Sequence, residues 1–232
     1  MKIDRTKNAG RNIVFGCMLK IYQIVMPFIM RTLMIYYMGI QYLGLNSLFT
    51  SILQVLNLAE LGVGSAMVYS MYKPIAVDDK KMICALMKLY RTYYRVIGIL
   101  IAFLGLCLVP FIPKLIKSDV PADINIYILY ILNLSVTVLS YWLFAYKNCL
   151  LDAHQRTDVA SKVTLVTNTL QYIVQFFTLC FLKNYYAYII VSLAAQALTN
   201  ILTAVVTTHM YPDYRPEGNL SKEVISGINR RI

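Results

Sequence analysis

Residues 13–36 read IVFGCMLKIYQIVMPFIMRTLMIY, a long apolar stretch that contains two cations, Lys20 and Arg31. A helix needs roughly 20 predominantly apolar residues to cross a bilayer. Five more stretches of similar length and composition follow, at 43–61, 96–115, 126–144, 163–181 and 187–210. The six stretches together predict an all-α integral membrane protein, built as a bundle of six transmembrane helices.

The overall composition favours the same class of protein. Hydrophobic residues make up 59% of the chain and charged residues only 14%, whereas soluble domains carry about 25% charged residues. The net charge is +11, but the basic residues lie in the short connections between apolar stretches. Membrane proteins place Lys and Arg there on the cytoplasmic side. Because no basic face stands apart from the spans, we expect no nucleic-acid partner.

The basic residues also predict an orientation. Of the 22 Lys and Arg residues, two lie inside the first apolar stretch and only Lys114, Lys117 and Lys183 lie in the connections of one side. The other 17 lie on the opposite side, which the positive-inside rule assigns to the cytoplasm. We therefore expect both termini in the cytoplasm, with a six-helix bundle over 1–212 and a basic cytoplasmic tail over 213–232.

Polar side chains recur at helical spacing within most of the apolar stretches. Helix faces that meet lipid are apolar, so such stripes face protein or water. Hydrogen bonding between packed helices would account for short stripes, whereas the long stripes with amide side chains favour a hydrated cavity. The predicted substrate-binding residues are Lys20, Gln23, Arg31, Gln54, Asn57, Asn168 and Gln171.

Charged residues inside the spans sharpen this prediction. Lys20 and Arg31 are about 16 Å apart along one helix face. They either reach towards the interfaces with their charged ends or form a positive wall for an anion, since a guanidinium pairs well with phosphate oxygens. Glu60 is the only acidic residue in the six stretches, and Gly62 and Gly64 loosen the helix after it. A coupling or gating role and simple solvation at a helix end both remain open for Glu60.

Motifs for catalysis and metal binding are missing from the sequence. It contains neither Gly-x-Ser-x-Gly nor His-Glu-x-x-His, and its five cysteines include no Cys-x-x-Cys pair. His154 and His209 stand alone. We therefore predict a protein that is not an enzyme and that has no metal site and no cofactor.

Four short segments resemble a known family. They are LGLNSLF at 43–49, LAELGVGSA at 58–66, SMYKPIA at 70–76 and LLDAHQR at 150–156. They resemble the polysaccharide export proteins, which are bacterial flippases for O-antigen, capsule and exopolysaccharide units. That family belongs to the superfamily of multidrug and lipid-linked oligosaccharide exporters. The resemblance implies a transporter of twelve to fourteen helices in the bacterial inner membrane, of which this chain would be the N-terminal half.

The resemblance also implies a function. It is the translocation of an undecaprenyl-pyrophosphate-linked oligosaccharide across the cytoplasmic membrane by alternating access, for surface polysaccharide synthesis. The expected partners are this lipid-linked oligosaccharide, membrane lipid, a polysaccharide polymerase and glycosyltransferases. One alternative is a multidrug exporter of the same superfamily, which would need acidic residues in its cavity. Another is a truncated, non-transporting membrane component of the polysaccharide assembly machinery.

Overall fold

The computed structural model describes residues 5–60, 62–116 and 120–230. All regular structure in these ranges is helical. The α-helices are α1 (Arg5–Tyr37), α2 (Ile40–Leu56), α3 (Val63–Ala76), α4 (Lys80–Leu108), α5 (Ile112–Leu115), α6 (Ile126–Trp142), α7 (Tyr146–Ala153), α8 (Thr157–Phe177), α9 (Tyr185–Met210) and α10 (Lys222–Asn229). Short 3-10 turns follow α2 and α4, and a π-helical turn, Thr178–Leu182, follows α8.

The structure confirms part of the predicted set of spans. Four continuous helical stretches are long and apolar enough to cross a membrane, namely Asn8–Tyr37, Lys80–Leu115, Thr157–Leu182 and Tyr185–Met210. A fifth is present if α6 and α7, which meet at a bend of 50°, count as one span. The stretch predicted at 43–61 is instead divided, because α2 ends after 17 residues and a 3-10 turn replaces its last part.

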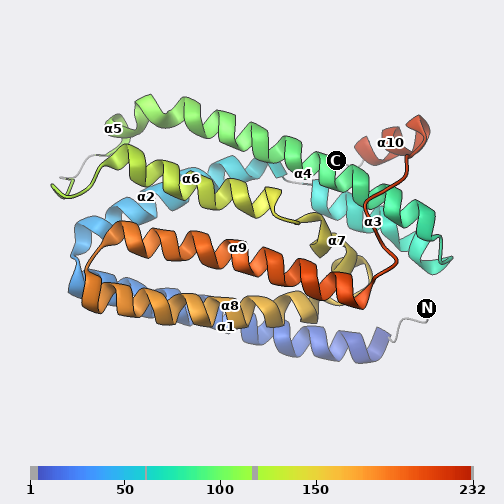
Figure 1. Cartoon of the computed structure of the whole chain (residues 1–232), viewed down its shortest axis with the longest axis horizontal. Coiled ribbons are helices and arrows are strands. Elements are labelled where there is room, and N and C mark those ends of the chain that lie inside the picture. The colour runs from blue at the N-terminus through green and yellow to red at the C-terminus, as the bar shows by residue number, and fades with distance from the viewer. Residues whose placement is uncertain (1–4, 61, 117–119, 231–232) are drawn as a thin grey trace.

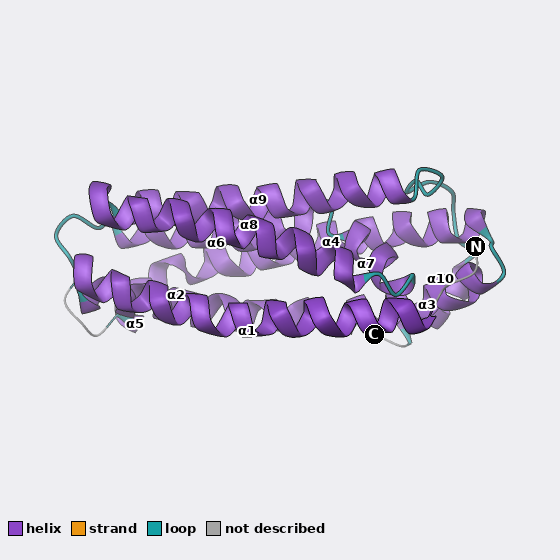
Figure 2. Ribbon diagram, turned by 90° about the horizontal axis from the view of Figure 1, so that it is seen from below, coloured by secondary structure: helices purple, strands orange, loops and turns teal. Residues whose placement is uncertain are grey.

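The helices lie side by side along the long axis of the molecule (Figure 1). α1 packs along α8, α8 on α9, α9 on α6, and α6 on α4, while α2 contacts α1, α4 and α6. The view from below shows the same side-by-side arrangement (Figure 2). The start of α1, the α3–α4 turn and the end of α9 lie at one end of the molecule, and the α8–α9 turn lies at the other (Figure 1).

Close helix packing depends on two glycines of α4. A Cβ atom at Gly98 would collide with the indole of Trp142, and one at Gly105 would lie 2.5 Å from Leu134 Cδ1. Both glycines therefore allow α4 to approach α6 more closely than any larger residue could. Tyr130 Oη donates a hydrogen bond of 3.0 Å to the carbonyl of Gly105, which fastens the same contact.

Side-chain caps begin several helices. Asp79 Oδ1 accepts a hydrogen bond of 3.0 Å from the amide of Met82 at the start of α4. Asn125 and Asn184 cap α6 and α9 in the same way. Such caps satisfy amides that have no partner within the first turn of a helix.

The segment after α9, predicted as a basic tail, folds back onto the α3–α4 end of the molecule. Lys80 Nζ lies 2.6 Å from Asp213 Oδ2, and this hydrogen-bonded ammonium holds the pKa of Asp213 below its usual range. Lys88 donates to Asn219 at 2.8 Å, and α10 packs on α3. Residues 213–230 therefore have defined contacts with the helical body.

Candidate functional site

The helical path of the chain is interrupted at two places near the middle of the molecule, between α2 and α3 and between α6 and α7 (Figure 1). Between α2 and α3 the chain forms the 3-10 turn Asn57–Glu60, and α3 begins after Gly62, whose φ is +93°. Between α6 and α7 the chain bends by 50° and Phe144 has a φ of +59°. Interrupted helices at membrane depth are tolerated where protein or a water-filled cavity surrounds them, and transporters often bind their ligands there.

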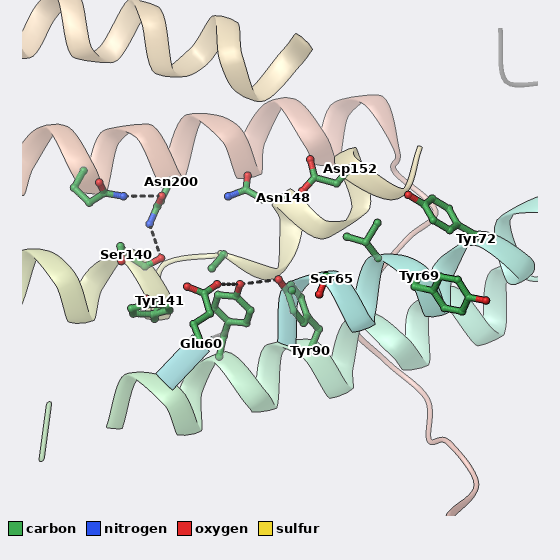
Figure 3. A pocket seen from close by; sticks show the side chains of 15 residues that line it. Glu60, Ser65, Tyr69, Tyr72, Tyr90, Ser140, Tyr141, Asn148, Asp152 and Asn200 are labelled. Atoms are coloured by element: carbon green, nitrogen blue, oxygen red, sulfur yellow. Dashed lines mark hydrogen bonds between the residues drawn. The ribbon is translucent and has the colours of Figure 1, made fainter. Parts of the chain in front are cut away.

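A cavity of about 750 Å³ lies where these two interruptions meet. Glu60 and Gly64 contribute to it from the first, and Tyr141 and Ala145 from the second. Figure 3 shows Glu60, Tyr90 and Tyr141 gathered on one side of the cavity and Asn148, Asp152 and Asn200 on the other. The volume falls within the range of about 300–1,000 Å³ that is typical of ligand pockets.

A chain of hydrogen bonds ends on the Glu60 carboxylate. Tyr90 Oη donates to Tyr94 Oη at 2.7 Å, and Tyr94 Oη donates in turn to Glu60 Oε1. Both tyrosines are buried on α4, with 4% and 7% of their surface exposed. Tyr141 Oη donates to Asn57 Oδ1 at 3.1 Å. Tyrosine hydroxyls therefore fasten the α2–α3 interruption to α4 on one side and to α6 on the other.

The opposite wall is held by amides of α9. Asn200 Nδ2 donates to the carbonyls of Ser140 at 3.2 Å and Leu139 at 3.4 Å, and Gln196 Nε2 donates to Asn200 Oδ1 at 3.2 Å. Both carbonyls belong to the last turn of α6, where the final backbone acceptors of a helix lack helical partners. The Leu139 carbonyl still accepts a hydrogen bond of 3.0 Å from the amide of Leu143. The Asn200 side chain thus stabilises the end of α6 beside the cavity.

The charge of the cavity differs from the sequence-based expectation. Its charged lining residues are Glu60 and Asp152, and no Lys, Arg or His of the described ranges lines it. Lys20 and Arg31, predicted as a positive cavity wall, are exposed on α1. Arg31 lines a separate surface hollow of about 480 Å³. No described residue of α1 lines the cavity. Instead α1 packs on α8, where Tyr22 and Thr169 share a hydrogen bond of 2.8 Å.

The other predicted contact residues lie in three different settings. Gln23 shares the α1 hollow with Arg31, and Gln54 is exposed on α2. Asn57 belongs to the α2–α3 interruption, where it accepts the hydrogen bond from Tyr141. It does not line the cavity itself, but its hydrogen-bond partner Tyr141 does.

The polar stripe of α8 takes part mainly in helix packing. Gln171 donates to Ser192 Oγ at 3.4 Å, and Gln175, which is buried, donates to the same oxygen at 2.7 Å. Asn168 is partly buried on the same helix. Interhelical hydrogen bonding, the simpler of the two explanations for these stripes, therefore accounts for the contacts that Gln171 makes with α9.

Most of the residues that line the cavity lie outside the set predicted from the sequence. Tyr90 and Tyr94 precede the predicted span at 96–115, and Asp152 follows the predicted span at 126–144. The four-residue spacing of the two tyrosines, which places them on one helix face, was a usable signal. No sequence signal pairs them with Glu60, because that contact depends on how α4 packs against the α2–α3 interruption.

Comparisons with known proteins return no relative: no protein-family model, no curated protein and no solved structure matches the chain. The described residues contain no group of three or more His, Cys, Asp or Glu side chains that could hold a metal ion. The candidate site is therefore defined by its geometry alone, as a polar, acidic and tyrosine-rich cavity between two interrupted helices.

Proposed function

We propose that the chain is a membrane-embedded flippase component that translocates a lipid-linked oligosaccharide. The observation that carries the proposal is the cavity at the two helix interruptions, because it offers hydrogen-bonding side chains in the middle of an otherwise apolar helical body. The short segments that resemble polysaccharide export proteins support it independently. The membrane is then the bacterial inner membrane, and both termini face the cytoplasm.

In this proposal the helices make six passes through the bilayer. The passes are α1, α2 with α3, α4 with α5, α6 with α7, α8, and α9. The start of α1 and the end of α9 lie at the same end of the molecule (Figure 1). An even number of passes agrees with this arrangement. The interrupted passes would change shape most easily during alternating access, because fewer backbone hydrogen bonds hold them.

The two polar regions would then have separate tasks. The glycan would enter the acidic cavity, and the pyrophosphate would meet the exposed cations Lys20 and Arg31 on α1. A guanidinium binds phosphate oxygens through two parallel hydrogen bonds, whereas an ammonium acts as a point charge. The chemistry of translocation requires no bond to be made or broken, so the protein would not be an enzyme.

Arg31 provides a direct test. In a host whose own flippase is deleted, the chain should restore surface polysaccharide, and Arg31→Ala should lower this display by at least about tenfold. Arg31→Lys should recover only part of it, since the paired hydrogen bonds are lost while the charge remains. Arg215→Ala, which removes an exposed cation of the tail, is the matched control and should display normally.

Membrane abundance must be measured for each of these variants, because display also falls when less protein is inserted. Normal display by Arg31→Ala at normal abundance would contradict a substrate contact at this residue. It would show instead that Arg31 only anchors α1 at the interface.

A second candidate function is the export of organic cations. It is favoured by one observation, the combination of Glu60 and Asp152 with five lining tyrosines, because carboxylates and aromatic faces both attract cations. Cells that express the chain should then accumulate less of a fluorescent organic cation and should not regain surface polysaccharide. These two results together would support this candidate over the first.

A further inference from the structure

The cavity and α1 separate the two signs of charge. Within the cavity, Glu60 and Asp152 are carboxylates and the other polar lining groups are neutral. The cations Lys20 and Arg31 are exposed on α1 and do not line it. Whatever part of a ligand occupies the cavity therefore meets negative charge without a compensating cation among the described lining residues.

The neutral lining groups match a polyhydroxylated ligand. Amides such as Asn148 and Gln196 offer both donors and acceptors, and the hydroxyls of Ser65 and Tyr141 do the same. The exposed rings of Tyr69 and Tyr72 add flat apolar faces to the lining, away from Glu60 (Figure 3). A sugar ring has hydroxyls at its edge and C–H groups on its faces, so it can use both kinds of group.

We propose that this cavity selects neutral or amino sugars and rejects sugars that carry a carboxylate. The proposal rests on the glycan function above and names the class of glycan. A uronic acid would place a third carboxylate in the cavity with Glu60 and Asp152, and like charges repel more strongly where water is partly excluded. An amino sugar would place an ammonium there and gain attraction instead.

The chain contains a natural reporter for a binding test. Its single tryptophan, Trp142, ends α6 and follows Tyr141, which lines the cavity. The purified full-length chain in lipid nanodiscs would be titrated with glucose, glucosamine and glucuronate, with Trp142 emission as the readout. Glucose and glucuronate differ only at carbon 6. The ratio of the concentrations at which they change the emission therefore isolates the effect of the carboxylate.

The expected result is that glucose and glucosamine change the emission at concentrations at least about tenfold lower than glucuronate does. In the double variant Glu60→Gln with Asp152→Asn, the concentration of glucuronate that changes the emission should lie within about threefold of that of glucose. Glu223→Gln, which neutralises an exposed carboxylate of α10, is the matched control and should keep the wild-type ratio.

A second variant keeps the test informative if the double variant does not fold. Asn148→Asp adds a carboxylate at an exposed position of the cavity lining, where folding is little affected, and should weaken glucuronate further relative to glucose. Equal binding of glucose and glucuronate by the wild-type chain would overturn the selectivity while leaving the glycan function in place. Failure of every sugar to change the emission would contradict the glycan function itself.

Discussion

Glu60 is the residue at which the α2–α3 interruption, α4 and the cavity meet. Its carboxylate accepts the hydrogen bond from Tyr94, which in turn accepts one from Tyr90. The sequence identified Glu60 as unusual because it is the only acid in the apolar stretches. It did not identify the tyrosines, because an aromatic residue near a span end is ordinarily part of the interfacial belt.

Removal of the Tyr94 hydroxyl should therefore weaken this junction. Tyr94→Phe keeps the ring and removes the hydroxyl that donates to Glu60, so the free energy of unfolding should fall by about 1.5–3 kcal/mol, as for other hydrogen bonds to charged groups. Thermal unfolding in detergent measures the change. Tyr93→Phe loses a hydrogen bond to Asn229 in the tail and is the control, with a smaller expected loss. Equal effects of the two variants would argue against a special role for the Glu60 contact.

At the scale of elements, the packing of α4 on α6 depends on residues without side chains. Gly98→Ala places a methyl group against the Trp142 indole, so either the indole or the helix must move. We expect a loss of about 1–3 kcal/mol in unfolding free energy, as for other overpacked sites. Gly44→Ala on α2, where no atom lies within 4 Å of the added carbon, should be neutral or stabilising by up to about 1 kcal/mol.

The same pair of variants distinguishes packing from propensity. If Gly98→Ala were as well tolerated as Gly44→Ala in the same unfolding assay, the result would contradict the close approach of α4 to α6 at Gly98. The sequence could not predict which glycine is a contact and which is free, because both lie within apolar helices and only the packing partner differs.

At the scale of the whole molecule, the sequence predicted the helical class and most of the long apolar helices, because length and composition decide both. It indicated a looser helix after Glu60, at Gly62 and Gly64, but it did not predict the interruptions that the structure shows at the ends of the second and fourth apolar stretches. The stretch at 43–61 ends in a 3-10 turn, and the stretch at 126–144 ends in a bend of 50°. Both features depend on partners distant in sequence, such as Asn200 against the end of α6.

The orientation of these passes can be tested directly. Reporter fusions after Asp79 and Asp213 should report the cytoplasm, and fusions after Gln41 and Asn184 should report the opposite side, because six passes would place 17 of the 22 basic residues on the first side. Alkaline phosphatase and fluorescent protein activities give complementary readouts. A cytoplasmic signal after Gln41 or Asn184 would contradict six passes with both termini inside.

The central claim, that the chain moves a lipid-linked glycan across a bilayer, is tested most directly by translocation in vesicles. Purified chain would be reconstituted into liposomes that carry a polyprenyl-pyrophosphate-linked oligosaccharide. The fraction of this oligosaccharide that an added glycosidase cleaves would be followed with time. Glycans on the outer surface are cleaved at once, and those inside become accessible only after translocation. We predict near-complete cleavage with the wild-type chain and slower cleavage with Arg31→Ala. Cleavage that stops at the outer leaflet, as in protein-free liposomes, would contradict the claim.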